Sequence, residues 1–430
     1  MYSGTMLAQD LQKGVIQDKV QCTQDTAQSY ALYLPSSYKE SEKWPIVYVF
    51  EPAARGSLPV EMYHEVAEEL GFILVCSNNS RNGDWNIGFS AADAIFLDTQ
   101  NRLSIDSRQV FTMGFSGGSR LALSIAELTK RVRGVIGVGA AQPIRREYIM
   151  NKNSNFLYAG LVGNRDMNYQ EHKQFVETLN SWNKSNLLLI SELDHQWAPA
   201  SDFKIAMTWM FNQVNPEMER DLSSLVQDKI AAYTDSVEVI DILRLAQSMR
   251  ALDPDFPADP MDKKLLKEEE KLYKKEVDFR LQLGDSLNVA IADYKSTGTR
   301  RWVINTIGSF QKRREKSKSL SSYLMYSRVL DYMRAMSIES GFRFLNQQEY
   351  ERVKVCVDVW SSYADNPRIK YWWYAKVNGL QQQKEECLEY LELLAQEGFS
   401  DLDLLGGEPA FDFVRTTTEF KDILDKIESN

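Results

Sequence analysis

The sequence has few cysteines and lacks any long apolar run. Its 430 residues include four cysteines, which lie far apart and form no C-x-x-C pair: Cys22, Cys76, Cys356 and Cys387. This spacing excludes a zinc knuckle and a dense disulfide framework. The longest apolar runs, such as 46–50 and 187–190, fall well short of the ~18 residues that suggest a membrane-spanning helix. We therefore expect a chain without a membrane span.

Basic residues and histidines are also scarce. The chain carries 50 Lys and Arg against 60 Asp and Glu, which gives a formal net charge of -10. Such a surface is poorly suited to neutralising phosphates, so nucleic acid is not expected as a partner. Three histidines occur, His64, His172 and His195, and all lie in the first half. Acid–base chemistry that depends on histidine is therefore expected there.

The two halves of the chain differ in composition. Residues 1–215 contain 14 Gly and 41 charged residues, whereas residues 216–430 contain 8 Gly and 69 charged residues. In the first half, short β-rich runs alternate with amphipathic stretches, which indicates an α/β domain with a mostly parallel sheet flanked by helices. The expected strands are 30–34, 46–50, 72–76, 110–113, 135–138, 156–162 and 187–190, and the expected helices are 59–70, 91–101, 119–130, 169–182 and 202–213.

Residues 216–430 are predicted to form a second, all-α domain. Their apolar residues recur at helical spacing, and their charged faces are thicker. Residues 253–260 contain three prolines, which forbid a continuous helix, so a loop is expected there. The stretch 263–282 places opposite charges three or four residues apart, which is typical of a solvated helix face.

A G-x-S-x-G motif at residues 114–118 joins an expected strand to an expected helix. Such a turn holds the hydroxyl of Ser116 exposed at the carboxyl end of the sheet, and the glycines leave room for a substrate. The backbone N–H of Gly117, at the start of the helix, can point at a developing oxyanion. A serine that merely caps the helix is the alternative. The strand before it and the helix after it favour a nucleophile at Ser116.

A serine nucleophile needs a base, and the base needs an orienting acid. After such a turn, the acid and then the histidine follow along the chain, each behind a strand. Asp166 and His195 occupy these two places. Asp194 is an alternative acid, but the immediate neighbour of a histidine is poorly placed to meet its own imidazole from behind. His64 and His172 fall inside expected helices, so we predict Asp166 as the acid and His195 as the base.

Aromatic residues surround this candidate centre. Phe115 precedes the serine, Trp197 lies two residues after His195, and Trp85 lies in a Gly- and Asn-rich loop after the strand 72–76. These side chains can stack on a phenolic acyl group or a sugar ring, or they can serve as ordinary packing. They are the candidate substrate-binding residues.

The first half resembles a known family of enzymes. The G-x-S-x-G turn, the run Ile105–Val110 before it, the segment 93–97 and the opening strand 30–35 with Tyr38 carry the resemblance. Together they are similar to the α/β-hydrolase family of feruloyl esterases, acetyl xylan esterases and polyhydroxybutyrate depolymerases, over about residues 25–213.

This resemblance implies an α/β-hydrolase fold and hydrolysis of carboxylic esters, on a small molecule or linked to a saccharide. It implies Ser116, Asp166 and His195 as the catalytic triad, and neither a metal nor an organic cofactor. It further suggests an exported, periplasmic or cell-envelope enzyme, although residues 1–4 show neither the basic nor the apolar segment of a signal peptide.

The chain departs from this family after the strand 46–50. Where the family usually has His-Gly, this chain has Glu51-Pro52. Pro52 has no N–H, so the second oxyanion donor is expected to be the amide of Ala53. A carboxylate beside the oxyanion would oppose the transition state unless Arg55 neutralised it. The alternative is that Glu51 points away and caps a loop.

Residues 367–427 resemble a tetratricopeptide-type helical hairpin, with small residues where two helices would cross. The run 379–399, followed by Glu408-Pro409 and Phe411, carries this resemblance. It implies either a surface for a protein partner or packing on the first domain. Two other classes of function stay open: a peptidase of the same fold, and a degenerate hydrolase that binds a partner through its helical half. The expected activity is that of a serine esterase.

Overall fold

The computed structural model of the chain describes residues 11–143, 145–218, 220–233, 237–250, 252–260, 262–363 and 367–428. Its contacts divide the chain into two compact units, Met1–Glu270 and Lys271–Asn430. The composition of the chain changes near residue 215, whereas the structure divides between Glu270 and Lys271.

The first unit is built around an eight-stranded sheet with the order β1-β2-β4-β3-β5-β6-β7-β8. β2 pairs antiparallel with both β1 and β4, and the other neighbouring strands are parallel. The strands are β1 (Ile16–Gln21), β2 (Ser29–Tyr33), β3 (Trp44–Phe50), β4 (Ile73–Ser77), β5 (Ile105–Phe115), β6 (Gly134–Val138), β7 (Leu157–Gly163) and β8 (Asn186–Ser191).

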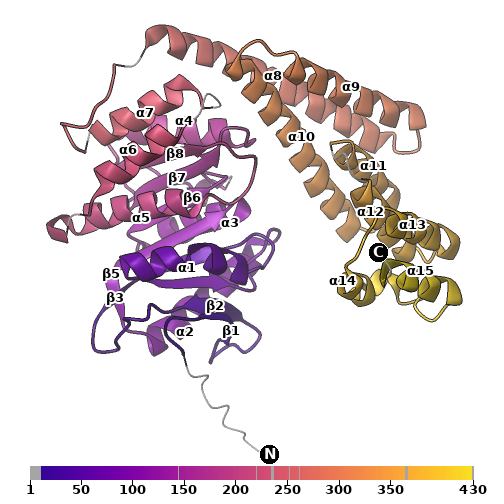
Figure 1. Ribbon diagram of the computed structural model, residues 1–430, viewed down its shortest axis with the longest axis horizontal. Coiled ribbons are helices and arrows are strands. Elements are labelled where there is room, and N and C mark those ends of the chain that lie inside the picture. Colours follow the sequence, from indigo (N-terminus) through magenta and orange to yellow (C-terminus); the bar gives the residue numbers. More distant parts are fainter. Residues whose placement is uncertain are drawn as a thin grey trace, which may run out of the picture. The chain divides into compact units, whose positions relative to one another are not determined.

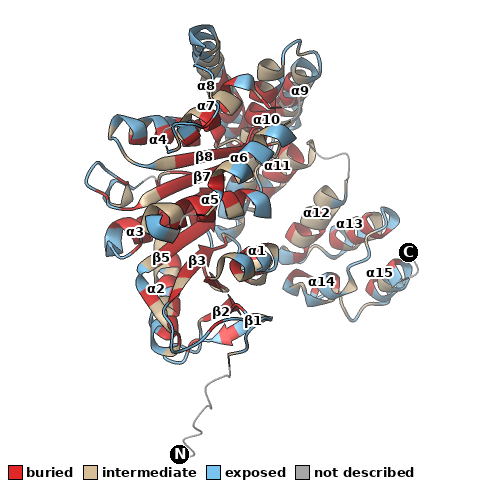
Figure 2. Cartoon of the chain, turned by 60° about the vertical axis from the view of Figure 1, so that its left-hand side comes forward, coloured by how far each residue is buried: buried red, intermediate tan, exposed pale blue. Residues whose placement is uncertain are grey.

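Helices cover both faces of this sheet (Figure 1). One core contains side chains of α1 (Ser57–Leu70), α5 (Ala200–Val214), α6 (Leu222–Ala232) and α7 (Val239–Arg250), and the other contains those of α2 (Trp85–Arg102), α3 (Gly117–Thr129) and α4 (Tyr169–Ser181). Figure 2 shows the central strands buried and the helices exposed on their outer sides. Because parallel strands covered on both faces are buried, their sequences consist largely of apolar residues. This is the α/β-hydrolase fold that the sequence predicts.

Each strand and helix predicted over residues 1–215 is present, and two features differ from expectation. β1 has a largely exposed edge and the polar sequence IQDKVQ, so no apolar run signals it. Trp85, predicted to lie in a loop, is the first residue of α2. The carboxylate of Asp84 accepts a hydrogen bond from the N–H of Asn86 and thereby caps the helix before that tryptophan.

Buried charged contacts hold α6 and α7 against the sheet domain. The ammonium of Lys229 in α6 lies 2.5 Å from the carboxylate of Asp202 in α5. The hydroxyl of Tyr169 in α4 donates to Asp241 in α7 at 2.6 Å, and Lys173 lies 3.4 Å from the same carboxylate. Breaking such a buried pair would leave an uncompensated charge, which explains why the first unit extends past residue 215.

The second unit is all-α, as predicted. The helix α8 (Lys263–Ala292) begins in the first unit, and the loop 253–260 precedes it. The helices that follow are α9 (Thr297–Glu315), α10 (Leu320–Asn346), α11 (Tyr350–Ser361), α12 (Arg368–Leu380), α13 (Lys384–Gln396), α14 (Leu402–Gly407) and α15 (Thr418–Glu428). Glu276 of α8 forms a buried ion pair with Arg328 of α10 at 3.0 Å. Within the described part of the chain, no helix is both long and apolar enough to cross a membrane.

Candidate active site

The candidate nucleophile Ser116 lies on a sharp turn between β5 and α3. Its φ of 52° is in the left-handed region that side chains rarely adopt, and its N–H donates to the carbonyl of Val138 at 2.8 Å. A side chain at Gly114 would overlap the backbone of Gly118, and one at Gly118 would overlap the carbonyl of Phe50. The two glycines therefore allow the close approach of strands and helix that the turn needs.

The structure brings Ser116, His195 and Asp166 together. His195 Nε2 lies 2.9 Å from Ser116 Oγ, and His195 Nδ1 lies 2.9 Å from Asp166 Oδ2. The Asp166 side chain is fully buried, and that of His195 is 14% exposed. The other oxygen of Asp166 accepts a hydrogen bond from the N–H of Asn168 at 2.7 Å. The alternative acid, Asp194, instead pairs with Arg165 at 2.8 Å.

Three parallel strands of the sheet, β5, β7 and β8, bring these residues to one edge of it. Ser116 follows β5, Asp166 follows β7 and His195 follows β8, so all three leave the carboxyl ends of their strands. Gly139, after β6, lies between them with a φ of 62°. A Cβ at Gly139 would lie 3.1 Å from Asp166 Oδ2 and 3.2 Å from His195 Cε1. An ordinary side chain there would crowd both partners.

In the loop after β3, backbone N–H groups donate hydrogen bonds to the carboxylate of Glu51. Glu51 is fully buried, and its Oε2 accepts hydrogen bonds from the N–H of Ala53 at 2.6 Å and of Arg55 at 3.1 Å. The Arg55 guanidinium pairs with the other oxygen. The amide of Ala53, expected to be the second oxyanion donor, is therefore engaged by Glu51 in this structure. Loop capping by Glu51 and its pairing with Arg55 were among the alternatives drawn from the sequence, whereas the hydrogen bond to Ala53 was not predicted.

Asn82 is a residue of this site that sequence reasoning missed. Its side-chain oxygen Oδ1 lies so close to Gly117 that a Cβ on the glycine would overlap it, and its backbone N–H donates to the carbonyl of Pro52 at 2.8 Å. Asn82, Gly117 and Trp85 line one small cavity of about 120 Å³. The Gly- and Asn-rich composition of this loop was the available signal, since a carboxamide carries both a donor and an acceptor.

Two of the candidate aromatic residues pack behind the histidine. The ring centroid of Phe115 lies 4.7 Å from that of His195 and 5.4 Å from that of Trp197. Both Phe115 and Trp197 are buried. Trp85 is half-buried and contacts Tyr148 at 5.3 Å between centroids. Of the three, Trp85 lines the cavity beside Gly117.

The other two histidines lie apart from this group. His64 is on α1 and packs edge-on against Tyr33. His172 is fully buried on α4, where its Nδ1 lies 3.0 Å from the hydroxyl of Tyr158. Burial lowers the pKa of His172 to about 3, with further lowering from the charge of Arg120. Among the described residues, no three His, Cys, Asp or Glu side chains gather in a group that could hold a metal ion.

The sequence matches no known protein family and no curated relative. Similar solved structures include an S-formylglutathione hydrolase from Staphylococcus aureus, with 16% identity and a TM-score of 0.36 over 44% of this chain and 90% of that one. A ferulic acid esterase from Anaeromyces mucronatus has 16% identity and a TM-score of 0.34 over 45% and 91%. A dipeptidyl peptidase 4 from Porphyromonas gingivalis has 14% identity and a TM-score of 0.34, over 46% of this chain and 35% of that one.

These neighbours comprise a hydrolase, a peptidase and an esterase, each at low identity. The assignment of the fold rests on the strand order and on the turn at Ser116.

Proposed function

We propose that the first unit is a serine hydrolase that cleaves carboxylic esters through an acyl-enzyme intermediate. The observation that carries the proposal is the continuous chain of hydrogen bonds from Ser116 Oγ through His195 to the buried carboxylate of Asp166. A serine hydroxyl is a weak nucleophile until a base accepts its proton, and this arrangement supplies an oriented base.

In the proposed mechanism, His195 Nε2 removes the proton of Ser116 as Oγ attacks the ester carbonyl carbon. Asp166 accepts a hydrogen bond from His195 Nδ1–H, which holds the ring in the required tautomer and stabilises the imidazolium. Collapse of the tetrahedral intermediate breaks the bond to the alcohol, and His195 returns the proton to the leaving oxygen. A water molecule, activated by the same nitrogen, then hydrolyses the acyl-enzyme.

We propose the N–H of Gly117 as the first oxyanion donor, because it lies directly after the nucleophile at the start of α3. The amide of Ala53 can act as the second donor only if it leaves the Glu51 carboxylate. Asn82 turns its side-chain oxygen toward Gly117, and rotation of the carboxamide would present its N–H there instead. We therefore assign the second donor to Asn82.

The substrate is proposed to be a small-molecule or saccharide-linked ester with a short acyl group. The cavity beside Gly117 has a volume of about 120 Å³, and Trp85 forms part of its wall. Phe115, which is buried against His195 and is itself backed by Trp197, serves to position the histidine rather than to stack on the substrate.

The test is labelling with a fluorophosphonate probe, comparing the wild type with Ser116→Ala and His195→Ala. We expect labelling of the wild type alone, followed by turnover of short-chain aryl and acetyl esters. Absence of labelling in correctly folded wild-type protein would contradict the proposal. It would favour the second candidate, a degenerate hydrolase that binds a partner, for which the engagement of Ala53 by Glu51 is the supporting observation.

We further propose that the α-helical region 367–427 is tetratricopeptide-like and carries the surface for any protein partner. In support, α12 and α13 form a hairpin, and Gly379 allows the carbonyl of Ala410 to approach α12 closely. Affinity capture with the full chain tests this idea. Retention of the same protein by the wild type and by Ser116→Ala, and its loss on charge reversal along α13, is the expected result.

A further inference from the structure

A second, larger cleft opens in the first unit, far from Ser116. Its volume is about 1200 Å³, which is ample for a drug-sized ligand. It is lined by α2, by the end of α3 and by the first residues of β5. Val110 lies six residues before Ser116 on β5, and at about 3.3 Å per residue the two are roughly 20 Å apart. The cleft therefore lies toward the amino-terminal part of β5, away from the turn at Ser116.

The floor of the cleft is apolar. Tyr48 and Phe96 stack there with their ring centroids 3.9 Å apart. Leu97 and Leu128 line it while remaining 44% and 52% exposed. Apolar side chains left exposed in a concave surface are typical of a ligand-binding groove.

The rim of the cleft is basic, in contrast to the acidic chain as a whole. The cations that line it are Lys43, Arg108, Lys130, Arg131 and Arg133, and Asp93 is the one acidic residue among its described lining residues. Arg108 pairs with Asp106 and Lys130 with Glu127.

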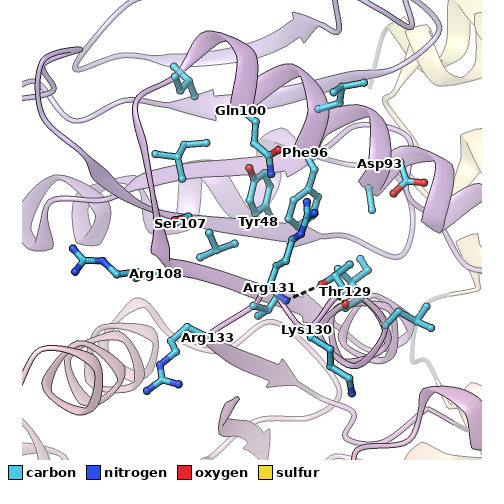
Figure 3. Close-up of a pocket in the computed structure, with 18 of the residues that line it drawn as sticks. Tyr48, Asp93, Phe96, Gln100, Ser107, Arg108, Thr129, Lys130, Arg131 and Arg133 are labelled. Carbon is cyan, nitrogen blue, oxygen red and sulfur yellow. Dashed lines mark hydrogen bonds between the residues drawn. The ribbon is translucent and has the colours of Figure 1, made fainter. Parts of the chain in front are cut away.

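Three of these cations are not neutralised by an ion pair with a described residue. Lys43, Arg131 and Arg133 form no ion pair with any residue that the structure describes. Figure 3 shows Arg131 reaching across the cleft toward Tyr48 and Phe96, whereas Arg108 and Arg133 lie at its edge. A cation above an apolar floor is matched by a molecule with an apolar body and an anionic head.

We propose that this cleft binds one amphiphilic anion, whose apolar chain lies on Tyr48, Phe96 and Leu97 and whose carboxylate or phosphate head is held by Arg131, with Arg133 adding positive charge at the edge of the cleft. Guanidinium groups bind both heads through charge-assisted, often paired hydrogen bonds. An anionic head accounts for the unpaired cations at the rim, and an apolar chain accounts for the exposed leucines.

The test is titration calorimetry with sodium dodecanoate below its micelle concentration. Dodecyl phosphate, dodecyltrimethylammonium and inorganic phosphate serve as comparison ligands. We expect both amphiphilic anions to bind with one molecule per chain, and we expect no binding of the cationic amphiphile or of phosphate alone. The stronger of the two anions identifies the head group. Equal binding of the cationic amphiphile would show that the rim cations do not select an anionic head, and it would overturn the proposal.

Variants locate the site. The double variant Arg131→Gln/Arg133→Gln should weaken binding about tenfold or more, since the head-group contact of Arg131 and the nearby charge of Arg133 are both lost. Arg301→Gln, which removes an exposed charge from α9, should leave it unchanged. Unchanged binding in the double variant would contradict the proposal.

The oligomeric state distinguishes a small ligand from a second copy of the chain as the occupant of the cleft. If a second copy of the chain covers the cleft, sedimentation velocity will show a dimer that Arg131→Gln/Arg133→Gln dissociates and that dodecanoate does not affect. That result would overturn the proposal of a small ligand.

Discussion

The N–H of Ala53 donates a 2.6 Å hydrogen bond to the carboxylate of Glu51, two residues earlier in the same loop. Glu51 is fully buried, and Arg55 balances its charge. The carboxylate thus takes a donor that the position of the loop, after β3 and beside the turn at Ser116, would otherwise offer to an oxyanion. The identity of the second oxyanion donor is the main mechanistic question that this pairing raises.

Substitution of Asn82 by Ala should lower kcat by about 100- to 1,000-fold with little change in KM, because one oxyanion donor acts only in the transition state. Asn86→Ala is the matched control, since Asn86 lies nearby and bonds to Asp84 instead. Steady-state kinetics on a short-chain aryl ester provides the measurement. Normal kcat in Asn82→Ala, together with a raised kcat in Glu51→Ala, would assign the donor to Ala53.

Asp166→Asn should reduce kcat by about 10⁴-fold, because an amide facing His195 favours the wrong tautomer of the ring. Asp194→Asn should change kcat little, since Asp194 pairs with the half-exposed Arg165 and not with the histidine. Kinetics of the two variants, with circular dichroism to verify folding, decides between the two carboxylates. The reverse order of effects would make Asp194 the orienting acid.

Gly139→Ala should impair activity more than its effect on stability explains. The residue has a φ of 62°, so alanine costs about 1–2 kcal/mol in backbone conformation. Its Cβ would also lie 2.8 Å from Phe115 and close to Asp166 and His195. We expect kcat to fall about tenfold or more, because the three side chains must shift.

Gly398→Ala is the control for backbone strain alone. Gly398 has a φ of 74°, and its Cβ would meet no atom within 4 Å. Its variant should lose similar stability in urea unfolding and keep full activity. Equal kcat in the two variants would show that Gly139 does not position the histidine.

His172 should make the stability of the first unit depend on pH. Its folded pKa of about 3 lies below the usual value of 6.5, so the unfolded chain binds the proton first. The stabilising contribution of the neutral ring is therefore complete above pH 6.5 and is lost as the pH falls. The loss amounts to at most about 1.4 kcal/mol per pH unit.

Urea unfolding between pH 7 and pH 5 measures this dependence. His172→Gln, which keeps an acceptor for the hydroxyl of Tyr158, should flatten the decrease. The same slope in this variant and in the wild type would show that other groups cause it.

The sequence alone determined the alternation of strands and helices, because buried parallel strands must be apolar and amphipathic helices must repeat near every 3.6 residues. It also predicted that Ser116, Asp166 and His195 follow strands whose carboxyl ends share one edge of the sheet. Such features are local, and each can be inferred from a few neighbouring residues. The polar edge strand β1 has no such local signal and was missed.

Only the tertiary structure decided which groups meet across long separations. Examples are the contact of Asn82 with Gly117 and the ion pair of Lys229 with Asp202, which extends the first unit past residue 215. Even the short-range pairing of Ala53 with Glu51 depends on burial of that carboxylate by the surrounding fold. Side-chain hydrogen bonds and clefts depend on distances in space, which composition, spacing and periodicity do not specify.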